Sequence, residues 1–139
     1  MVVKGINFKS YPFAALVAGY MMVFVDGWLK GFIGLFGIFP GASNAVWFIT
    51  HLMDSMVFAL LFAWPAVYNK LPGGGWLKGM VFGFLFWILV SIISFISGAL
   101  GATMFKQMQF TASAAFSGIL LHLVYGFFLG ILYVPAQSD

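Results

Sequence analysis

The stretch from residue 75 to residue 98 reads GWLKGMVFGFLFWILVSIISFISG and contains one charged side chain, Lys78. A helix that crosses the hydrocarbon core of a bilayer needs about 20 mostly apolar residues, because its backbone polar groups can bond only within the helix there. The stretch is long and apolar enough, and Pro72 and a run of glycines precede it as a break between elements. It therefore predicts a membrane-spanning helix from Trp76 to about Gly98.

Three other stretches meet the same requirement. They run from a cap at Ser10 to about Gly31, from about 43 to 68, and from about 111 to 134. Pro135 stops the last of them. The sequence thus predicts an all-α membrane protein, a four-transmembrane-helix bundle in a single membrane domain over residues 1–139.

The composition excludes several classes of protein. Of the 139 residues, 63% are apolar and only 6% are charged, against about 25% charged in soluble domains. So few charges rule out a soluble domain, a disordered chain and a nucleic-acid binder. The chain also has no Arg, Glu or Cys, which removes disulfides, thiolate metal sites and paired-Glu catalysis.

Lysine counts predict the orientation. Four spans place both chain ends on one side, where Lys4, Lys9, Lys70 and Lys78 fall, while Lys30 and Lys106 fall on the other side. Cytoplasmic loops carry the excess of Lys. We therefore expect a multi-pass protein of the prokaryotic plasma membrane with cytoplasmic N- and C-termini.

Small residues four apart predict where helices touch. Such residues share a helix face and let another backbone approach closely. Two glycine rows have this spacing, one on the third span and one on the fourth: Gly75, Gly79 and Gly83, and Gly126 and Gly130. They indicate helix packing.

A shift of the sequence by 71 residues brings His51 onto His122 and Ser55 onto Gly126. Such self-similarity suggests a duplicated helical hairpin, with half-repeats of about 12–69 and 74–136. An even number of spans per unit would relate the halves by an axis along the membrane normal.

The chain resembles small four-span integral membrane proteins of bacteria and archaea whose function is unknown. The likeness is carried by histidine-containing helices with small residues four apart, as in Ser55 and Ala59 or Gly126 and Gly130. The resemblance implies the four-span architecture and no particular activity.

Ionisable side chains within spans are costly and point to function. His51 and His122 each sit above a strip of small residues, so we expect them to face neighbouring helices at similar depth. Two imidazoles from two helices can bind both faces of a b-type haem. Simple hydrogen bonding to neighbouring backbone is the alternative, and no cofactor at all is the leading expectation.

A divalent metal is a second alternative. His51 and Asp54 are three apart on one helix face, and with His122 and Asp26 they would offer nitrogen and carboxylate ligands. A chance HxxD pattern explains the same spacing.

Three classes of function follow from these features. The leading hypothesis is a non-enzymatic accessory subunit of a larger membrane complex, respiratory or otherwise redox, which packs against other integral membrane subunits and lipid. The alternatives are a haem-binding or metal-binding electron-transfer unit and a small proton-coupled transporter or channel.

Overall fold

The computed structural model of the protein describes residues 5–33, 37, 44–101 and 111–136. Within these residues four helices are long and apolar enough to cross a membrane. The helices are α1 (Tyr11–Ile33), α2 (Ala45–Ala63), the short α3 (Pro65–Tyr68), α4 (Gly75–Ala99) and α6 (Ala112–Leu132). The prediction of an all-α, four-helix membrane protein is confirmed, and the outer helix surfaces contact lipid.

Side-chain caps and one proline set the ends of the helices. Asn44 caps α2 by accepting a hydrogen bond from the backbone of Trp47, and Thr111 caps α6 in the same way, both at 3.1 Å. The predicted second span of 43–68 is wrong at its end, because α2 stops at Ala63 and Pro65 begins α3. The ring of a proline forces the residue before it out of the helical region, and Trp64 accordingly has a ψ of 123°.

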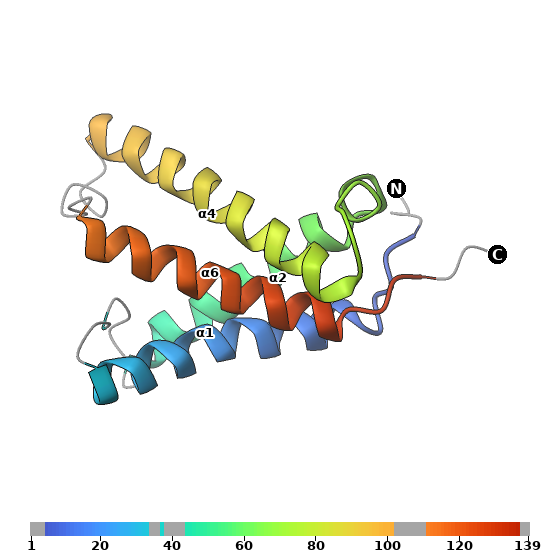
Figure 1. Cartoon of the computed structure of the whole chain (residues 1–139), viewed down its shortest axis with the longest axis horizontal. Helices are drawn as coiled ribbons and strands as arrows, with labels where there is room; N and C mark the ends of the chain where they lie inside the picture. Colours follow the sequence, from blue (N-terminus) through green and yellow to red (C-terminus); the bar gives the residue numbers. More distant parts are fainter. Residues whose placement is uncertain (1–4, 34–36, 38–43, 102–110, 137–139) are drawn as a thin grey trace.

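The helices form two antiparallel pairs that meet through α6. Figure 1 shows α6 between α4 and α1, and α2 packs on α1. The segments that precede α1 and follow α6 lie at the same end of the bundle, where the backbone N–H of Val134 donates to the Ser10 hydroxyl at 2.7 Å. Because the chain crosses the membrane four times, the segments before α1 and after α6 must lie on the same side of the membrane.

Burial is concentrated in the half of the bundle that carries these terminal segments. The buried residues of α2 are all in its second half, from Ser55 to Ala63, and three of the four on α4 lie between Gly79 and Gly83. Phe62 of α2 is fully buried there, with its ring centroid 5.2 Å from that of Phe82 on α4. The first half of α2 has no buried residue, so one face of that helix is open.

The α4–α6 pair crosses through glycines. Gly79 lies so close to α6 that an added Cβ atom would collide with the carbonyl oxygen of Gly126 and lie 2.8 Å from the Cα atom of Gly130. Gly83 meets the backbone of His122 and Gly126, and Gly75 meets that of Gly130, in the same way. The two backbones are therefore in direct contact, which only residues without a side chain allow.

Candidate functional site

Each ionisable residue singled out in the sequence lies on a different part of the bundle. His51 and His122 are half-buried, Asp26 on α1 is only 3% exposed, and Asp54 is exposed. These differences in exposure depend on how each helix is rotated about its own axis, and the contacts between the helices set that rotation.

The α1–α2 crossing holds His51. A Cβ atom on Gly19 of α1 would collide with the hydroxyl of Ser55, so the two helices touch at this point. One turn before Ser55, the Nε2–H of His51 donates to the carbonyl oxygen of Gly19 at 3.0 Å. The ring of Trp47 stacks on the imidazole with centroids 5.2 Å apart. His51 thus fastens α2 to α1.

Two tyrosines, Tyr125 on α6 and Tyr133 directly after it, fix the position of α6 along α2. The hydroxyl of Tyr125 donates to the Ser55 carbonyl at 2.6 Å, and that of Tyr133 donates to the Ala63 carbonyl at 3.2 Å. Both pairs are 70 residues apart. A position on α2 is therefore level with the position 70 residues later on the parallel helix α6.

This register places the two imidazoles at nearly the same depth. By the spacing of 70, His51 is level with residue 121 of α6, and His122 is the next residue along that helix. The two rings are close enough to interact electrostatically. The Nδ1–H of His122 donates to the carbonyl oxygen of Gly118 on its own helix at 2.8 Å, and the Phe86 ring lies 5.4 Å away. These contacts support the expectation of similar depth, which stays a prediction.

The two histidines differ in the nitrogen that they use. His122 donates from Nδ1, which leaves Nε2 as the nitrogen with a lone pair in the neutral ring. A ligating histidine commonly has such a backbone partner for its other nitrogen. His51 instead uses Nε2 to hold α1, so it would have to release Gly19 to ligate haem through that atom. Haem ligation therefore stays a prediction, with His122 as the better-prepared ligand.

The four candidate metal ligands do not form a cluster. Across the described ranges, no group of three or more His or Asp side chains lies in a position to hold one ion. Asp54 is exposed although His51 beside it is half-buried, and Asp26 is enclosed on α1. The four-residue metal site has no support in this geometry.

The half-repeats likewise stay a prediction. The first pair of helices crosses at Gly19, and a shift of 71 residues matches Gly19 with Val90. The second pair, α4 and α6, crosses instead at Gly79 and Gly83. His51 bonds a neighbouring helix, whereas His122 bonds its own. The two pairs of helices therefore cross at different positions, even though α2 and α6 lie parallel and level.

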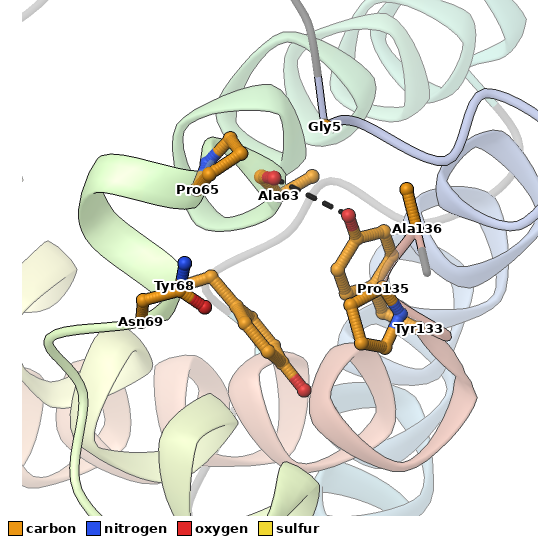
Figure 2. A pocket seen from close by; sticks show the side chains of 8 residues that line it. All are labelled: Gly5, Ala63, Pro65, Tyr68, Asn69, Tyr133, Pro135 and Ala136. Carbon is orange, nitrogen blue, oxygen red and sulfur yellow. Dashed lines mark hydrogen bonds between the residues drawn. The ribbon is translucent and has the colours of Figure 1, made fainter. Parts of the chain in front are cut away.

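A pocket of about 170 Å³ lies at the terminal end of the bundle. Figure 2 shows Tyr68 and Tyr133 among its lining residues, with the hydrogen bond from Tyr133 to Ala63 across it. The ammonium group of Lys78 donates to the carbonyl oxygens of Tyr68 and Leu71, at 2.7 and 2.8 Å, and lies 4.6 Å from the centroid of the Tyr68 ring. Burial raises the pKa of both the Tyr68 and the Tyr133 phenol. These groups stabilise the chain after α2 and leave few free polar atoms for a ligand.

The outward side of α2 carries the most unusual group. Asp54 is the middle residue of this 19-residue helix. Its carboxyl group is exposed, and it lies close enough to His51, one turn earlier, to interact with that ring electrostatically. Thr50, one turn earlier, is exposed on the same side and donates its hydroxyl to the Val46 carbonyl at 2.9 Å.

Sequence reasoning missed Thr50, Tyr125 and Tyr133, whereas the spacing of four between Ala15 and Gly19 indicates a packing face on the first helix. The spacing of eight between the two tyrosines equals that between Ser55 and Ala63, but nothing in the sequence distinguishes these rings from its many other aromatic side chains. Comparisons with models of protein families, with curated proteins and with solved structures found no match to this chain.

Proposed function

We propose that this protein is a non-catalytic accessory subunit of a larger membrane complex and that it joins the complex through the outward face of α2. A single observation carries the proposal, namely the exposed Asp54 at the middle of that helix.

The outer α2 face is one continuous helical surface. Its exposed residues recur at intervals of three and four, so they lie on one side of the helix. They are Val46, Ile49, Thr50, Met53, Asp54, Val57 and Leu61. The face is thus a strip of aliphatic and Met side chains with two polar groups at its centre.

Asp54 makes contact with lipid alone unfavourable for this face. Nine residues separate it from either end of α2, about 13 Å at 1.5 Å per residue, so its short side chain cannot reach the membrane surface. An acidic side chain at the middle of a spanning helix costs about 2.5–3.5 kcal/mol on an insertion scale. A second helix that packs over the outer α2 face would remove the carboxylate from lipid and give it a polar partner.

Site-specific photo-crosslinking in the native membrane tests the proposal. A benzoyl-phenylalanine in place of Met53, which is 62% exposed on the outer α2 face, should crosslink to a transmembrane segment of one other protein. The matched control replaces Phe95 on α4, which is 76% exposed on a helix side without charges, and should crosslink to lipid. Mass spectrometry of the crosslinked peptide identifies the partner and decides whether the complex is a redox assembly. Crosslinks to lipid alone at both positions would contradict the proposal.

A further inference from the structure

We infer that the outer α2 face binds a transmembrane helix of another protein that carries a lysine or arginine near its middle, at the depth of Asp54. This inference rests on the proposed function and specifies the chemistry of the partner.

The distribution of charge within the bundle requires a positive partner. The acidic residues of the four long helices are Asp26 and Asp54, and only Asp54 is exposed. No lysine lies near the middle of any of these four helices, because Lys30 is in the last turn of α1 and Lys78 in the first turn of α4. The membrane-embedded surface of the protein therefore exposes a carboxyl group at the middle of α2 with no lysine of the four helices at its depth, although the whole chain has a formal net charge of +3.

A second copy of this chain does not satisfy Asp54. Two copies inserted in the same orientation and related by an axis along the membrane normal would place their α2 helices in parallel, with the two Asp54 carboxylates at equal depth. Two ionised carboxylates at close range repel, so this pair needs one carboxyl group to be protonated, and none of the lysines on the four helices reaches that depth to form an ion pair. Ions and lipid headgroups remain at the membrane surfaces, far from the carboxylate.

A basic side chain on a neighbouring helix satisfies the carboxylate fully. A charge-assisted hydrogen bond from an ammonium or guanidinium group is stronger than a neutral one, and the surrounding apolar residues of the face exclude water from it. The exposed Thr50 hydroxyl adds an acceptor one turn away. Met53 and Val57 supply the apolar contact area around the pair.

Synthetic transmembrane peptides in phosphatidylcholine vesicles test the inference. Three peptides of leucine and alanine carry a central lysine, no lysine, or a lysine near one end, and fluorescence energy transfer measures their association with the labelled full-length protein. The central-lysine peptide should associate about 30-fold more tightly than the other two. Asp54→Asn should abolish this preference, whereas Phe95→Leu, a change on the exposed side of α4 and away from the outer α2 face, should keep it.

Two results of the peptide experiment would overturn the inference. One is equal association of the three peptides with the protein. The other is that the protein associates with itself, that Asp54→Asn changes this self-association, and that the peptides do not compete with it. A Met53 crosslink to a helix without a basic residue at this depth would also reject it while leaving the accessory-subunit proposal intact. Crosslinks to lipid alone would reject the accessory-subunit proposal itself.

Discussion

The phenol of Tyr125 stabilises the bundle by linking two helices that are not neighbours in the chain. The side chain is 2% exposed, and its hydroxyl donates to a backbone carbonyl of α2 at 2.6 Å. Tyr133 makes a longer bond of 3.2 Å two turns later. The pair provides an internal comparison, because one bond starts within α6 and the other from the residue that follows it, and both end on α2.

We expect Tyr125→Phe to lower the free energy of unfolding by about 1 kcal/mol, because it removes a buried hydrogen bond while keeping the ring. Tyr133→Phe should cost less, since its bond is longer. Denaturation of each variant in mild detergent gives the difference. Equal losses would contradict the ranking by bond length, and no loss in Tyr125→Phe would show that its hydrogen bond to Ser55 contributes little.

The stability of the protein should decrease at alkaline pH. Burial raises the pKa of the Tyr68 and Tyr133 phenols above the ordinary value of 10.0, so the unfolded chain releases these protons before the folded protein does. The stabilising contribution is complete below pH 10 and is lost as the pH rises through the folded values. The unfolding temperature should therefore be constant between about pH 7 and 9 and fall above about pH 10. A Tyr68→Phe/Tyr133→Phe double variant should show a shallower fall, and an identical pH profile would contradict this account.

At the scale of the helices, the backbone contact between α4 and α6 is the tightest. Gly79→Ala should destabilise the bundle by about 1–3 kcal/mol, because the added Cβ atom meets backbone that cannot move aside. Gly27 on α1 is the matched control, since a Cβ atom there meets nothing within 4 Å. Gly27→Ala should leave stability unchanged or raise it by about 0.5–1 kcal/mol, as alanine does in an open helix position. Equal unfolding temperatures for the two variants would exclude a close-packed α4–α6 contact.

The number and type of the helices could be predicted because each depends on a local property. Apolar length fixes a span, and Thr111 begins α6 because its side-chain hydroxyl caps the first turn. The end of α2 was missed because the apolar run continues past Trp64, and run length alone does not show that a proline will divide it.

The exposure of Asp54 could not be predicted, because the helices are apolar on all sides and no periodicity indicates which face points inward. The rotation of α2 depends on its contact with Gly19, which involves a residue far away in the sequence. The depth of the His51 and His122 rings was accessible from their spacing, but their hydrogen-bond partners were not.

At the scale of the whole molecule, the orientation in the membrane remains to be measured. The chain has no cysteine, so single cysteines can be introduced at Phe8, beside α1 at the terminal end, and at Leu100, at the opposite end of α4. The lysine excess predicts that a membrane-impermeant maleimide added outside intact cells labels Leu100→Cys and not Phe8→Cys. The reverse pattern would invert the proposed topology.

The parallel register of α2 and α6 has a consequence for biosynthesis. A chain is made from its N-terminus, so the α1–α2 pair, joined through Gly19 and His51, is in the membrane before α6 exists. The bonds from Tyr125 and Tyr133 form only later, and they form on the side of α2 that faces the bundle. The opposite side with Asp54 is complete as soon as the first pair has inserted. A partner helix can therefore dock on the nascent protein while the second pair is still being translated.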